Sequence, residues 1–116
     1  MARTVFIVFS NCTDPAREQE FNDWYNDVHL PDILETPHFV AATRYELAGE
    51  PREGQGKYLA VYEIDNDDVD AAAAAIRQTI ASTHERGRRT DTLQALGGGY
   101  YRPIFSLDAH PAEPQS

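Results

Sequence analysis

Four segments of the chain have strand length and are rich in apolar, β-branched and aromatic residues, the composition that favours β-strands. The first, TVFIVF, is an apolar run, which predicts that both of its faces are covered. The third alternates, with Tyr58, Ala60, Tyr62 and Ile64 on one face. The predicted strands are residues 4–9, 38–47, 57–64 and 98–105, and Pro103 places the last at a sheet edge or a bulge.

Two further segments carry apolar residues at helical spacing. Asp14 is a good N-cap and Pro15 suits a first helical position, so a helix is predicted over residues 15–30. We expect Pro31 to interrupt this helix, because its ring biases the preceding residue away from helical angles, and PDIL could carry one more turn before Thr36. The second helix is predicted for VDAAAAAIRQTIASTHE, residues 69–85, after the capping segment DNDD.

The resulting order is β-α-β-β-α-β, which is the split βαβ plan of an α+β domain. This plan places two helices on one face of a four-stranded antiparallel sheet and leaves the other face bare. Since neither face of the sheet is plainly polar, the bare face is expected to be an association surface. We expect one domain over residues 1–107 and a flexible polar tail over residues 108–116.

The composition of the chain argues against several classes of partner and cofactor. The 116 residues carry a net charge of −9, which argues against a nucleic-acid partner. The first apolar run is too short to span a membrane and no leader-like segment precedes it, so no membrane partner and a cytoplasmic location are expected. The single cysteine allows no intramolecular disulfide, and the four histidines lack the spacing of a zinc site. No motif indicates a metal or any other cofactor.

The segment NDWYNDVHLPDIL holds the candidate chemistry. Asn22, Tyr25 and His29 are three and four residues apart, so they follow one stripe of the predicted helix. A helix that ends at Pro31 would hold His29 at the negative end of the helix dipole, next to two aspartates. That position would raise the pKa of His29, whereas burial would lower it.

Simpler interpretations compete with a catalytic one. A single histidine near a helix end is commonly a capping residue or a satisfied surface residue. Trp24 suits the core-facing stripe, and Tyr58 and Tyr62 are ordinary strand residues that would pack at a dimer interface.

The first half of the chain, FIVFSNCTDPAREQEFNDWYNDVHLPDILETPHFVAATRYEL, resembles small proteins of the dimeric α+β barrel superfamily, and most closely the EthD-like and REDY-like groups. The similarity extends over about residues 3–105 and includes the ending YRPIF. The shared pattern is an asparagine after the first strand, an F-x-x-W-Y-x-x-x-H-x-P run and a P-x-F/V entry into the second strand. These features fall here on Asn11, Phe21, Trp24, Tyr25, His29, Pro31, Pro37 and Phe39.

The resemblance implies a ferredoxin-like subunit that forms a homodimer through its sheet faces, with a pocket between sheet and helices. Relatives include cofactor-free cyclases, lactone isomerases, monooxygenases without metal or flavin, and haem-degrading enzymes; some accompany natural-product biosynthesis. The chain does not reproduce the full Asn, Trp and His placement of the haem degraders. The motif histidine, here His29, would be the acid–base candidate.

The leading hypothesis is therefore a cofactor-independent cyclase or isomerase that acts on an apolar, polyketide-like or aromatic molecule. His29 would transfer a proton and Tyr62 would polarise a carbonyl, a part that Tyr25 could also take. The other candidate substrate-binding residues are Asn11, Asn22, Trp24, Tyr25 and Tyr58. Three alternatives remain: a metabolite-binding dimer without catalysis, a cofactor-free monooxygenase, and a purely structural dimer module. Catalysis requires at least two polar groups that converge on one cavity.

Overall fold

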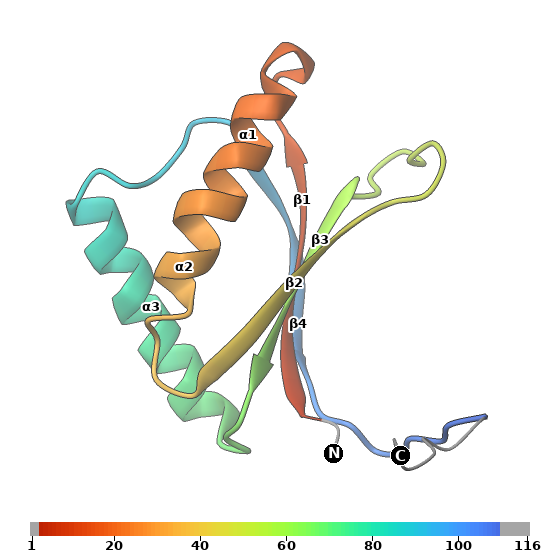
Figure 1. Cartoon of the computed structure of the whole chain (residues 1–116), viewed down its shortest axis with the longest axis vertical. Coiled ribbons are helices and arrows are strands. Elements are labelled where there is room, and N and C mark those ends of the chain that lie inside the picture. Colours follow the sequence, from red (N-terminus) through yellow and green to blue (C-terminus); the bar gives the residue numbers. More distant parts are fainter. Residues whose placement is uncertain (1–2, 110–116) are drawn as a thin grey trace, which may run out of the picture.

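The computed structural model describes residues 3–109. Its four strands form one antiparallel sheet in the order β2-β3-β1-β4, and the helices all cover the same face of this sheet (Figure 1). The strands are β1 (Thr4–Cys12), β2 (Phe39–Glu46), β3 (Tyr58–Ile64) and β4 (Leu93–Tyr101). The helices are α1 (Glu18–Trp24), α2 (Leu30–Ile33) and α3 (Val69–Glu85). The predicted α+β, ferredoxin-like architecture is confirmed.

The two central strands place alternate side chains under the helices. Tyr58, Ala60, Tyr62 and Ile64 of β3 are all buried, as their alternation predicts. In β1 the equivalent inward positions include Phe6 and Val8, which pair with Tyr62 and Ala60. β1 runs three residues further than predicted, and within one chain only its inner face is covered; Phe9, on the other face, is 40% exposed.

The first helix does not end before Pro31. The chain continues from α1 through a π-helical segment, η2 (Tyr25–His29), directly into α2. The N–H of Leu30 donates to the carbonyl of Tyr25, five residues back, and the backbone angles remain helical throughout. A π-turn adds a residue to the helical turn, so the proline ring and its missing N–H are accommodated without a break. The expected interruption was therefore wrong, the further turn over PDIL is present as α2, and His29 lies inside a continuous helix.

The last strand also differs from its prediction. β4 begins at Leu93, five residues early, and ends at Tyr101, before Pro103. Gly97 and Gly98 have φ values of 102° and 150°, and the pairing with β1 shifts register beside them. A Cβ at Gly98 would lie 1.8 Å from the carbonyl oxygen of Ile7. The glycines therefore form a bulge inside the strand, which a propensity argument misreads as a connection.

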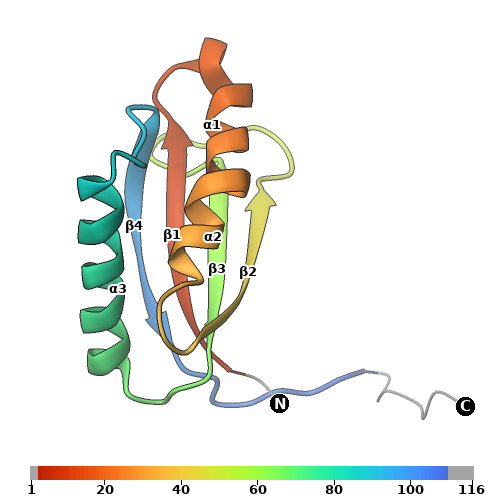
Figure 2. The ribbon, with the colours of Figure 1, turned by 60° about the vertical axis from the view of Figure 1, so that its left-hand side comes forward.

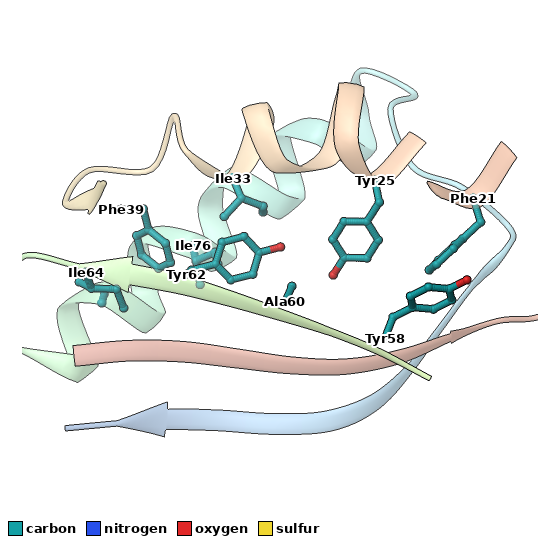
Figure 3. Close-up of a cluster of buried hydrophobic side chains, with 10 residues drawn as sticks. Phe21, Tyr25, Ile33, Phe39, Tyr58, Ala60, Tyr62, Ile64 and Ile76 are labelled. Atoms are coloured by element: carbon teal, nitrogen blue, oxygen red, sulfur yellow. The ribbon is translucent and has the colours of Figure 1, made fainter. Parts of the chain in front are cut away.

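The predicted second helix coincides with α3, and the side chain of Asp68 caps it by accepting from the N–H of Ala71. α3 lies over β4, whereas α1 and α2 lie over the rest of the sheet (Figure 2). The core is the layer between them and β3 (Figure 3). It consists of Phe21, Tyr25, Ile33, Phe39, Tyr58, Ala60, Tyr62, Ile64, Ala72 and Ile76.

The opposite face of the sheet has no covering element among the described residues (Figure 1). Its side chains alternate with the core positions, and they include Val5, Ile7, Phe9, Tyr45, Leu59, Val61 and Tyr101. Beyond β4, residues 102–109 have no regular structure, and residues 110–116 of the predicted tail lie outside the described part. No helix in residues 3–109 is long and apolar enough to cross a membrane.

Candidate functional site

A cavity of about 530 Å³ lies between the inner face of the sheet and the helices. Its wall is formed by the sheet, by the helices on both sides of the cavity (α1 to α2, and α3) and by the connection from α3 to β4. Most of the wall is aromatic or aliphatic, and polar side chains enter it at a few points, which is the usual make-up of a small-molecule site. The lining residues are Phe6, Val8, Trp24, Tyr25, His29, Ile33, Tyr62, Ile76, Ile80, Thr83, His84, Arg88, Arg89, Thr90, Asp91, Leu93 and Ala95.

The π-helical segment places His29 in this cavity. Its ring stacks on Trp24, with centroids 4.6 Å apart, and meets the ring of Tyr25 edge-on at 5.0 Å. Trp24 is itself fixed, because its indole N–H donates to the carbonyl of Arg88 at 2.9 Å. The extra residue of the π-turn brings these three rings together, and π-turns are frequent at functional sites.

Burial lowers the pKa of His29 from 6.5 to about 4, because the cavity wall removes water from the charged form. The carboxylate of Asp32 opposes this shift, whereas His84 and Arg44 add to it. Of the two opposing effects that the sequence left open, burial is therefore the larger, and the helix end lies further on because the helix continues past His29 to Ile33. At neutral pH the imidazole is uncharged and keeps one nitrogen free to accept a proton.

Tyr62 supplies the second polar group. Its side chain points from β3 toward the helices, and Figure 3 shows its hydroxyl directed along the core toward Tyr25. Within residues 3–109 this buried hydroxyl has no hydrogen-bond partner of normal geometry. Burial, together with the neighbouring Tyr25, raises the pKa of Tyr62 far above its ordinary value, so the hydroxyl stays protonated. A buried donor without a partner is costly, and such groups are rare unless a ligand uses them.

Of the seven residues proposed from sequence, Trp24, Tyr25, His29 and Tyr62 line the cavity together. The other three lie elsewhere. Asn22 and Tyr58 line a second pocket at the β2 edge. Asn11 accepts a hydrogen bond from the backbone N–H of Lys57 at 2.7 Å, so it ties β1 to the start of β3.

Sequence reasoning missed the part of the wall that α3 and its following loop provide. Thr83 is buried there, and His84 is exposed yet borders the cavity. Arg88 also borders it and makes a 2.7 Å ion pair with the buried carboxylate of Asp32. Arg88 and Arg89 reach the cavity because α3 packs beside β4, whereas Arg86 lines a different pocket.

The cavity could hold an apolar molecule that carries a carbonyl or a hydroxyl group. In the described range, no group of three or more His, Cys, Asp or Glu side chains is arranged to hold a metal ion. The polar groups that line the cavity include a neutral imidazole and an undissociated phenol. Others come from α3 and the α3–β4 connection, and they are Thr83, His84, Arg88, Arg89, Thr90 and Asp91.

Comparisons with known proteins agree with this architecture. The family model described as "Domain of unknown function (DUF4286)" matches residues 3–85. A search of curated proteins found no match. Among solved structures, the chain is similar to HapK from Hahella chejuensis, with a TM-score of 0.64 and 17% identity over 92% of this chain and 98% of that one.

Two further structures share the fold. One is a putative monooxygenase from Shewanella loihica PV-4, with a TM-score of 0.57, 15% identity, and 91% and 99% coverage of this and that chain. The other is an ethyl tert-butyl ether degradation (EthD) family protein from Bacillus halodurans C-125, with a TM-score of 0.50, 18% identity, and 82% and 94% coverage. At these identities the similarity establishes the fold, and at that level the resemblance to EthD-like proteins is confirmed.

Proposed function

The chain belongs to the family described as domain of unknown function DUF4286, and from that starting point we propose that it catalyses a cofactor-independent proton transfer on a small, mostly apolar molecule bound in the cavity. One observation carries the proposal: an uncharged imidazole, His29, and a buried phenol, Tyr62, converge on one apolar cavity, and the phenol hydroxyl has no partner of normal geometry among the described residues.

The two groups suit the two halves of an enolisation. Tyr62 donates its hydrogen bond to a carbonyl oxygen of the ligand, while the free nitrogen of His29 accepts a proton from the adjacent carbon. The negative charge that develops on the oxygen is stabilised by the phenol. When the ligand is a β,γ-unsaturated carbonyl compound, the imidazolium then returns its proton to the γ-carbon of the dienolate. The step changes a double-bond position without net oxidation, which is an isomerisation, and an internal electrophile would convert it into a cyclisation.

The shape of the cavity favours a flat, apolar ligand. The stacked rings of Trp24 and His29 provide one wall, and Phe6 and Val8 of β1 belong to the sheet-side wall. A volume of about 530 Å³ is in the range of ordinary small-molecule sites. An aromatic or polyketide-like carbonyl compound meets both the apolar wall and the two polar groups.

A second candidate function is binding without catalysis, and one observation favours it. With its pKa near 4, His29 is a weak base, whereas an efficient general base has a pKa near the working pH. In this case His29 and Tyr62 only orient a metabolite by hydrogen bonds. The two functions therefore predict the same ligand, but only the catalytic function predicts that the protein accelerates removal of a proton from a carbon atom of the ligand.

The test uses 2-tetralone, a compact aromatic ketone with exchangeable hydrogens next to its carbonyl. Its exchange in deuterated buffer is followed by NMR with the wild-type protein and with His29→Gln and Tyr62→Phe. We expect the wild type to accelerate exchange, and each variant to lose about a hundredfold of that acceleration, the scale of one positioned acid or base.

Matched controls lie outside the cavity wall. Tyr100→Phe removes a hydroxyl from a ring that packs on Phe6 without lining the cavity, and His38→Gln changes an exposed histidine. Both controls should keep the wild-type rate. Tetralone that binds in the cavity without faster exchange would support the binding function instead, and equal acceleration in His29→Gln would eliminate His29 as the base.

A further inference from the structure

Arg44 is a half-buried cation on the inner face of β2, in register with Ala60 of β3. Its guanidinium carbon lies 4.3 Å from the ring centroid of Tyr25 and 5.2 Å from that of Tyr58. Figure 3 shows these two aromatic side chains between α1 and the sheet. The aromatic faces attract a cation, but they replace only part of the water that burial removes.

No carboxylate among the described residues forms an ion pair with Arg44, although Arg3, Arg17 and Arg88 each have one. Glu46, two residues along β2, lies instead within 3.7 Å of Lys57. A partly desolvated charge without a counter-ion is unfavourable, and burial lowers the pKa of Arg44 for the same reason.

The hydrogen bonds of Arg44 are also incomplete. Its two terminal nitrogens donate to the side-chain oxygens of Asn26 at 2.8 Å and Asn22 at 3.0 Å. A guanidinium has five N–H donors, so three remain. One of these, Nε, is buried and has no partner within residues 3–109. The two asparagines thus hold the guanidinium in place without neutralising it.

Arg44 lines a pocket of about 430 Å³ at the β2 edge, together with Asn22, Asn26, Tyr45, Glu46 and Tyr58. This pocket shares no lining residue with the larger cavity, and Tyr25, which lines the cavity, stacks against the guanidinium. Within the pocket, the ring of Tyr58 is the aromatic surface in contact with the cation.

We propose that this pocket is a second ligand site, which binds a small monocarboxylate with its carboxylate against the guanidinium of Arg44. The carboxylate supplies the missing counter-charge and accepts from the terminal N–H groups that the two asparagines leave free, while the body of the ligand lies in the rest of the pocket. The proposal is independent of the reaction in the larger cavity.

The surrounding charges select a monocarboxylate over a phosphate. Glu46 lines the pocket, and Glu18 accepts a hydrogen bond from the hydroxyl of Tyr58 at 2.9 Å. Two nearby carboxylates repel a doubly charged anion more strongly than a singly charged one. Among the described residues a single arginine lines the pocket, and its one positive charge matches one carboxylate.

Benzoate is the probe, and benzamide is its uncharged control of the same shape. The isotope-labelled wild-type protein is titrated with each, and with inorganic phosphate, while backbone amide shifts are recorded. We expect benzoate to move the resonances of Asn22, Asn26 and Arg44, with a Kd on the order of 1–10 mM, as for a single charged contact on a fragment. Benzamide and phosphate should bind at least tenfold more weakly at these residues.

Two variants test the cation. Arg44→Gln should abolish the shifts around the pocket. Because Arg44 packs on the core rings of Tyr25 and Tyr58, the spectrum of the variant must first show the wild-type fold. Glu46→Gln changes an exposed side chain, removes a like charge and should tighten benzoate about threefold, the factor expected for one partly screened charge.

Each opposite result rejects the site. If benzamide binds as tightly as benzoate, the site does not recognise an anion. If phosphate binds more tightly than benzoate, the site does not select a monocarboxylate. The role of Arg44 is also rejected if benzoate shifts only residues of the larger cavity, or if Glu46→Gln leaves benzoate binding unchanged or weakens it. Both results can be obtained even if Arg44→Gln does not fold.

Discussion

Lowering the pH should destabilise this protein through His29 in a window that the structure defines. The pKa of His29 is about 4 in the folded chain, and an unfolded histidine has a pKa of 6.5. Between these two values the unfolded state binds a proton that the folded state refuses. Stability from this group is therefore fully present above pH 6.5 and is lost as the pH falls toward 4.

The magnitude follows from the difference between the two pKa values. At pH 5 the unfolded state is favoured by about 2 kcal/mol through this one proton. Because the ring borders a cavity that solvent can enter, screening reduces the expected effect to about 1–2 kcal/mol. His29→Gln cannot titrate, so this part of the pH dependence should disappear in the variant.

The measurement is urea unfolding of the wild type and of His29→Gln at pH 7.5 and pH 5.0. All other titrating groups are common to both proteins, so the change in their stability difference isolates His29. Relative to the wild type, the variant should gain about 1–2 kcal/mol on going to the lower pH. An NMR titration of the His29 ring should show a midpoint near 4. A midpoint near 6.5, or parallel pH profiles of the two proteins, would refute the burial argument.

Further predictions concern the stability and the assembly of the protein. Tyr62→Phe removes a buried hydroxyl without a partner, so thermal unfolding should show a gain of about 1 kcal/mol; a loss of that size would mean that the hydroxyl is satisfied. Gly98→Ala places a Cβ 1.8 Å from the Ile7 carbonyl oxygen and should cost at least about 3 kcal/mol in urea unfolding, whereas wild-type stability would disprove the bulge. The bare sheet face predicts a homodimer, so light scattering should give about twice the 13.0 kDa chain mass, and Phe9→Asp should give a folded monomer. A monomeric wild type would contradict that prediction.

The sequence by itself determined the element order and most of the architecture. Local signals are enough for this, because the alternation of Tyr58, Ala60, Tyr62 and Ile64 fixes the inner face of β3, and Asp68 with the alanine-rich run fixes α3. A β-α-β-β-α-β order then leaves few ways to build a sheet. The stripe that ends at His29 was visible for the same reason, since helical spacing is a property of neighbouring residues.

The tertiary structure decided what that stripe does. Proline usually ends a helix, but packing favours a π-turn that carries the helix through Pro31, and burial then decides the direction of the His29 pKa shift, which the sequence had left open. Packing also separated Asn22 from His29 by placing them in different pockets. Arg44 was not a candidate at all, because a lone arginine in a strand has no local signature. Its meaning depends on which rings, amides and carboxylates meet it from distant parts of the chain.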